Sequence, residues 1–96
     1  MPHTPHPFVE RVQTGVRLEK RMLKVLKALA DSLDVTLSDL LEGIVLHALE
    51  GRAPFSPGTR AKADELRRVF GLTLTAADAH HLKEKPARVR PARSVR

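Results

Sequence analysis

The chain has 96 residues and a formal net charge of +6, and it contains no cysteine, tryptophan or tyrosine. A chain of this length predicts one small domain with tails, and its limited core favours folding with a partner. Without cysteine, the chain has no disulfide, no thiolate nucleophile and no cysteine zinc site. No apolar run approaches the roughly 20 residues of a membrane span, so we expect a cytoplasmic protein without a membrane partner.

The positive charge is concentrated in two regions that are separated by an acidic one. Residues Glu10–Ala30 contain six Lys or Arg against two Glu, and Lys83–Arg96 contain six against one. The intervening Asp31–Phe55 contains five acidic residues and one Arg. Basic regions favour polyanions such as nucleic acid, although a solvated tail explains the charge equally well. The scarcity of aromatic residues argues against readers of single strands or RNA, which stack bases on aromatic rings.

Residues Arg11–Leu18 alternate between two kinds of side chain, as a half-buried β-strand does. One face carries Val12, Thr14, Val16 and Leu18, and the other carries Arg11, Gln13, Gly15 and Arg17. No second good strand is present, and a lone strand leaves its backbone hydrogen-bonding groups unpaired. The pattern therefore predicts that a second copy of the chain supplies the partner strand.

Helical signals dominate the rest of the chain. Apolar residues at helical spacing predict an amphipathic helix over Glu19–Leu33, with Asp34 in the left-handed region after it. Thr36 and Asp39 have the spacing of a capping box and open a helix to about Glu50, which is apolar around most of its circumference. A third helix is expected from Pro57 to Phe70, and a short one from Thr75 to about Lys83.

This order of elements resembles the ribbon–helix–helix family of DNA-binding proteins, of the Arc and MetJ type. The matching residues are Val16-Arg17-Leu18, the stripe Leu26, Leu29, Ala30 and Leu33, and Val35–Leu41. The resemblance implies a mainly α fold: a homodimer with an intermolecular two-stranded antiparallel ribbon, plus one or two extra C-terminal helices. The implied organisation is a disordered N-terminal arm (1–10), a DNA-binding and dimerisation domain (11–51), a linker with a helical extension (52–83) and a basic disordered tail (84–96).

The resemblance also implies a mechanism, in which the ribbon enters the major groove of double-stranded DNA. It assigns base reading to Arg11, Gln13, Gly15 and Arg17, and phosphate binding at the amino end of the second helix to Thr36, Leu37 and Ser38. The implied dimer interface consists of Val12, Val16, Leu18, Leu41, Ile44, Val45 and Ala48. Gly15 brings no side chain to the reading face, and the Asp39 carboxylate lies near the expected phosphate.

A transcriptional regulator associated with the nucleoid is the function that we expect from these features. Two alternatives remain open: an antitoxin whose C-terminal segment binds a partner protein, and an architectural DNA binder of low specificity. Enzyme chemistry is not expected, because His47, His80 and His81 have neither a paired nucleophile nor metal-ligand spacing. We accordingly expect no catalytic residue, metal site or cofactor.

Overall fold

A computed structural model describes residues 7–86 of the chain, and these residues form three helices and one short helical turn. The helices are α1 (Lys20–Ser32), α2 (Leu37–Leu49) and α3 (Pro57–Val69), and the turn is the 3-10 helix η1 (Ala76–Asp78). None of these helices is long and apolar enough to cross a membrane.

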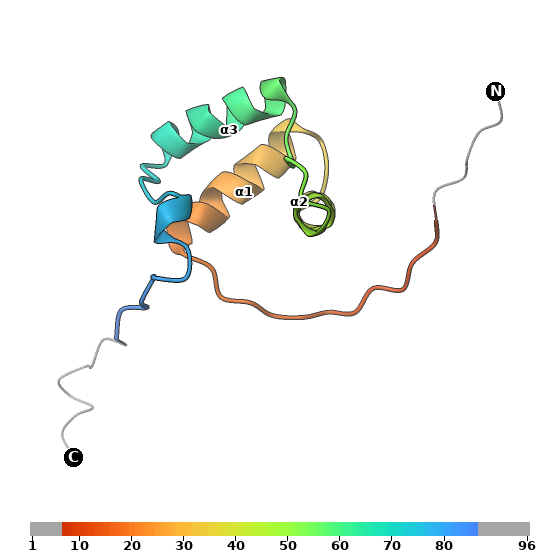
Figure 1. The fold of residues 1–96 in the computed structure, drawn as a ribbon, viewed down its shortest axis with the longest axis horizontal. Helices are drawn as coiled ribbons and strands as arrows, with labels where there is room; N and C mark the ends of the chain where they lie inside the picture. The colour runs from red at the N-terminus through yellow and green to blue at the C-terminus, as the bar shows by residue number, and fades with distance from the viewer. Residues whose placement is uncertain (1–6, 87–96) are drawn as a thin grey trace, which may run out of the picture.

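Helix α1 is the centre of the arrangement. Figure 1 shows α3 lying along α1 in the opposite direction, while α2 is seen end-on and therefore crosses both at a large angle. Both α2 and α3 pack against α1, but no Cα atoms of α2 and α3 approach within 8 Å of each other. The fold is thus two helix pairs that share α1.

The core of the described residues is small. Its buried side chains are Val25, Leu29, Ala30, Leu40 and Ala63. Four of these, all except Val25, form one cluster, and Phe55 and Leu66 are among the partly buried residues that pack against it. Helix α2 contributes only Leu40 as a buried residue, while its Val45, Leu46 and Leu49 are exposed.

Side-chain caps set the starts of the helices close to where the sequence predicts them. The Thr36 hydroxyl accepts a hydrogen bond from the Asp39 N–H at 3.0 Å, and the Ser56 hydroxyl accepts one from the Thr59 N–H at 3.2 Å. These bonds satisfy N–H groups that the first helical turn leaves free. At the end of α1, Asp34 adopts a left-handed φ of 58°, as predicted, and the chain turns directly into α2.

The last predicted helix is much shorter than expected. Thr75 and Asp78 form a complete capping box, but the helical turn that they open ends at Asp78 rather than near Lys83. Ala79 leaves the helical region with a ψ of 138°, and His80 has a left-handed φ of 70°. A cap alone therefore does not sustain a helix where no apolar face follows it.

The predicted strand at Arg11–Leu18 is not present, and the ribbon–helix–helix fold that depends on it is contradicted. Between residues 7 and 86 the chain forms no β-strand, and Arg11–Leu18 is extended backbone exposed along its whole length. Strand pairing needs a second backbone, and no other segment among residues 7–86 supplies one. The predicted disordered regions 1–10 and 84–96 lie largely outside the described residues, which exclude 1–6 and 87–96.

Candidate nucleic-acid interface

Residues 7–18, called the extended segment, precede α1. Figure 1 shows the segment passing below α1 and α2, and every one of its residues is exposed. The four predicted base-reading residues, Arg11, Gln13, Gly15 and Arg17, all lie in it. The apolar residues of the segment are also uncovered, with Val12 81% and Val16 71% exposed.

Arg11 is bound to helix α2. Its Nε and Nη2 atoms donate hydrogen bonds of 2.7 Å each to the two carboxylate oxygens of Glu42. Mainly because Arg11 donates these bonds, the pKa of Glu42 is held below its ordinary value. The guanidinium fork of Arg11 is therefore occupied on its Nε side.

Arg17 makes the same kind of contact with a different part of the chain. Its Nε donates to one carboxylate oxygen of Glu84 at 3.1 Å, and its Nη2 donates to the other. These bonds likewise lower the pKa of Glu84. Glu84 lies 67 residues further along the chain, in the stretch after η1, so the extended segment is tied at its end as well as near its start.

The predicted phosphate site at the amino end of α2 is brought close to Arg11. Arg11, Thr36 and Ser38 line an open hollow of about 620 Å³, but Asp34 and Asp39 line it too. Two carboxylates here, and Glu42 on Arg11 beside them, oppose the binding of a phosphate anion. Leu37, the third predicted member, is half-buried.

Helix α1 carries a second cationic surface. Lys20, Lys24 and Lys27 recur at i, i+4 and i+7, so they share the face opposite the buried Val25 and Leu29. All three are exposed, and within residues 7–86 no carboxylate oxygen lies within 4.0 Å of their ammonium groups. Seven other cations of the described chain are paired, namely Arg11, Arg17, Arg21, Arg52, Arg60, Lys62 and Arg67, so the lysine face stands out as three uncompensated charges on one helix.

The predicted dimer-interface residues divide into two groups. Val12, Val16, Leu18, Val45 and Ala48 are exposed, which leaves them free for a second copy. Leu41 and Ile44 are half-buried, and Ile44 packs against the protomer's own core. The sequence analysis did not select Leu46 and Leu49, which are 64% and 79% exposed and extend the apolar face of α2.

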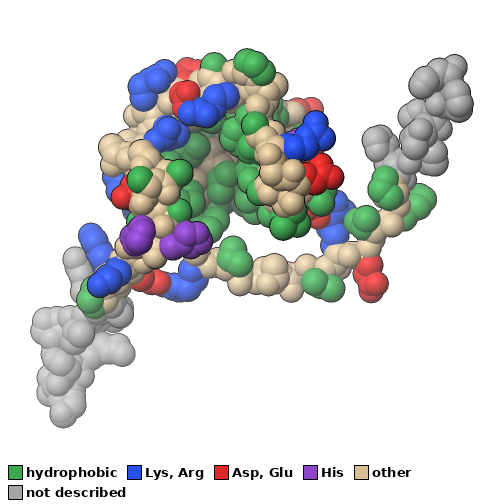
Figure 2. Space-filling view, viewed as in Figure 1, with side chains coloured by type: hydrophobic (Ala, Val, Ile, Leu, Met, Phe, Trp, Pro, Cys, Tyr) green, Lys and Arg blue, Asp and Glu red, His purple; other side chains and the backbone are tan. Residues whose placement is uncertain are grey.

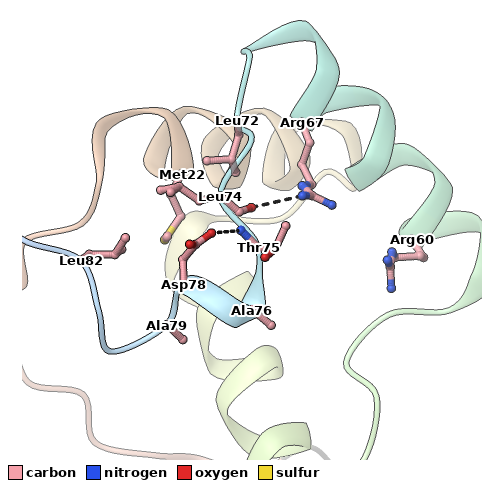
Figure 3. Close-up of a pocket in the computed structure, with 10 residues that line it drawn as sticks. All are labelled: Met22, Arg60, Arg67, Leu72, Leu74, Thr75, Ala76, Asp78, Ala79 and Leu82. Carbon is pink, nitrogen blue, oxygen red and sulfur yellow. Dashed lines mark hydrogen bonds between the residues drawn. The ribbon is translucent and has the colours of Figure 1, made fainter.

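A separate hollow of about 550 Å³ lies between α3, the start of α1 and the segment after α3 (Figure 3). Its charged groups already have partners: Arg60 and Arg67 both lie against Asp64, and Arg67 also donates to the Leu74 carbonyl at 3.2 Å. The Asp78 carboxylate accepts from the Thr75 N–H. Among these contacts, only the bond from Arg67 to Leu74 joins residues 72–78 to α3, and no charged group that lines the hollow is left without a partner among the described residues.

Figure 2 shows Lys and Arg side chains gathered over the upper part of the molecule, where α3 lies in Figure 1, and His side chains at the lower left.

In the part of the chain that the structure describes, no three His, Cys, Asp or Glu residues are placed to hold a metal ion. The Nδ1 of His47 lies 2.6 Å from the Gly43 carbonyl oxygen of its own helix.

Glu42 and Glu84 are the residues of this interface that sequence reasoning missed. For Glu42 the signal is the contrast between a basic region at Glu10–Ala30 and an acidic one at Asp31–Phe55, which selects no particular glutamate. Glu84 lies in the basic region Lys83–Arg96, and no signal in the sequence points to it. Comparison with known proteins adds no candidate: no protein-family model, curated protein or solved structure matches the chain. The likeness to the ribbon–helix–helix family therefore stays a prediction from the sequence.

Proposed function

We propose that the chain is a double-stranded DNA-binding protein that acts as a homodimer and regulates transcription in the cytoplasm, at the nucleoid. The observation that carries this proposal is the uncompensated lysine face of α1, which follows directly on an exposed, arginine-bearing extended segment. Positive charge of this kind attracts the phosphate backbone irrespective of sequence.

Phosphate contacts are assigned to Lys20, Lys24 and Lys27. Their ammonium groups are exposed and have no nearby carboxylate among the described residues, so binding to phosphate breaks no existing ion pair. We prefer them to the predicted site at Thr36–Ser38, because Asp34 and Asp39 line that site. Phosphate contacts position a protein on DNA and carry no sequence information directly.

Base contacts are assigned to the extended segment. The major groove of DNA admits an α-helix or a two-stranded ribbon, so an extended segment fits into it. Gln13 and Arg17 have the chemistry for this task, since Gln pairs with adenine and Arg with guanine through two hydrogen bonds each. At Gly15 nothing lies within 4 Å of where a Cβ would be, so the backbone there is open to close approach.

Contact with a second copy of the chain is assigned to the exposed apolar face of α2, which is formed by Val45, Leu46 and Leu49. An apolar helix that packs against only one neighbour leaves surface that costs free energy in water. A two-fold axis through this face would set the same patch against itself, as in most homodimers. The C-terminal extension offers a smaller exposed apolar surface, because Ala63 and Leu66 pack in the protomer core and only Val69 and Leu82 are exposed large apolar side chains there.

The test is selection of bound sequences from random double-stranded DNA by the full chain. An enriched two-fold-symmetric motif is the expected result, and salt-dependent binding without enrichment would support the architectural alternative instead. No binding at low salt would contradict the proposal.

The lysine assignment is tested by replacing Lys20, Lys24 and Lys27 with Gln. The slope of log affinity against log salt should fall by about 0.9 for each phosphate contact that is lost. The matched control replaces Arg52, Arg60 and Lys62 with Gln, which changes the net charge equally. Each of these three residues lies within 4.0 Å of a carboxylate. Equal slopes for the two triple variants would overturn the assignment of the lysine face.

A further inference from the structure

The two arginines of the extended segment, Arg11 and Arg17, are both already engaged by carboxylates of the same chain. Arg11 is held through two hydrogen bonds by Glu42 of α2, and Arg17 through two by Glu84 after η1. The two glutamates lie 31 and 67 residues away from their arginines in sequence. Two independent parts of the fold therefore contact the same short segment in the same way.

This geometry matters because a guanidinium presents a fixed fork of N–H donors. Two neighbouring donors of the guanidinium can bind a carboxylate, and the same arrangement can bind a phosphate or the O6 and N7 acceptors of guanine. The Nε side of one arginine cannot serve a glutamate and DNA at once. Glu42 and Glu84 therefore compete with DNA for Arg11 and Arg17.

The pairs are suited to exchange because they are accessible to solvent. The Arg17 and Glu84 side chains are 81% and 64% exposed, so water and salt screen their attraction. Between the two anchored arginines, Gln13 and Gly15 are exposed and can meet DNA first. An encounter complex can thus form before either ion pair breaks.

We infer that Glu42 and Glu84 form an autoinhibitory latch, which holds Arg11 and Arg17 on the protein until DNA replaces the two carboxylates. The inference rests on the proposed DNA-binding function and adds a regulatory step to it. DNA binding then releases the extended segment from α2 and from the stretch after η1. The lowered pKa values of both glutamates agree with carboxylates that are ionised and paired in the DNA-free protein.

The test compares the full chain with its E42Q/E84Q variant, using a fluorescein-labelled mixed-sequence DNA duplex and fluorescence anisotropy at fixed salt. Glutamine keeps the shape of the side chain but removes the charge that holds each arginine. Loss of two exposed pairs should tighten DNA binding by about 2- to 30-fold. The E50Q/E65Q variant is the matched control, because those glutamates pair with Arg52 and Lys62 and the net charge changes equally.

A second comparison separates release of the latch from a general loss of negative charge. In an R11A/R17A background, E42Q/E84Q should improve affinity no more than E50Q/E65Q does. A gain in the wild-type background that is no larger than the control's would overturn the latch while leaving DNA binding intact. Failure of every variant to bind the duplex would defeat the proposed function itself, which is a distinguishable result.

Discussion

At the residue scale, Gln13 has the simplest expected behaviour of the proposed base-reading side chains. It is uncharged, exposed and located between the two anchored arginines. Because its replacement frees no carboxylate, the effect of Gln13→Ala reports only on contact with DNA. We expect specific binding to weaken by about 1–3 kcal/mol, the usual worth of a two-point base contact. Titration of the selected site and of a scrambled duplex measures it, and an equal loss on both would refute base reading.

The ion pairs of Arg11 and Arg17 predict a pH dependence at the residue scale. Hydrogen bonding lowers the pKa of Glu42 and Glu84 from an ordinary value of 4.5. A group with a lowered pKa favours the paired state at pH values above its ordinary pKa and loses this contribution as the pH falls through the lowered one. The extended segment should therefore stay attached at neutral pH and detach well below pH 4.5.

Backbone ¹⁵N relaxation of residues 11–17 follows this detachment, since a released segment moves on a faster timescale. The E42Q/E84Q variant serves as the control and should show a mobile segment at every pH. A segment in the wild-type chain that is equally mobile at pH 7 and at acid pH would contradict the attachment.

Residue-scale pairing was also the least predictable property of the interface. Arg11, Gln13 and Arg17 could be selected because alternation places them together over a short stretch of chain. Their partners could not, because Glu42 and Glu84 meet them only after the chain has folded back over 31 and 67 residues. No local spacing rule extends over such separations.

At the element scale, the three helices were predicted well and the strand was not. Each helix carries both a period of 3.6 residues and a local cap, for example the Thr36 hydroxyl on the Asp39 N–H. Both signals are satisfied within a few residues, so they act regardless of the remaining fold. A strand needs a distant backbone, and the alternation in Arg11–Leu18 describes side chains rather than a partner.

Gly43 provides a test at the element scale, because it lies inside α2 and a Cβ there would meet nothing within 4 Å in the protomer. Gly43→Ala should raise the free energy of unfolding by about 1 kcal/mol, the difference in helix propensity. Urea unfolding at low protein concentration measures this change. If a partner's helix lies directly against Gly43, the variant should instead be less stable than the wild-type chain. The difference between the two free energies of unfolding should then grow as the protein concentration rises.

At the scale of the whole molecule, the small buried core contrasts with the exposed apolar face of α2. Leu49 is 79% exposed, so Leu49→Glu should leave the protomer folded while placing two charges in a symmetric interface. We expect the dimer dissociation constant to rise by about tenfold or more. Sedimentation equilibrium measures it, and Val69→Glu on α3, also at an exposed apolar position, is the control. Equal association of the two variants would exclude α2 as the interface.

The central position of α1 has a further consequence for the order in which the molecule opens. No Cα atom of α2 lies within 8 Å of one in α3, and α2 contributes only Leu40 to the cluster that also holds Ala63 of α3, so detachment of α2 should leave most of the contact between α1 and α3 in place. Backbone amides of α2 should therefore exchange with deuterium sooner than those of α1, as expected of a less stable cooperative unit. If a second copy covers α2, the exchange of the α2 amides should slow as the protein concentration increases, while the exchange of the α3 amides should change less. The exchange rates of the individual helices would then show which helix lies in the interface.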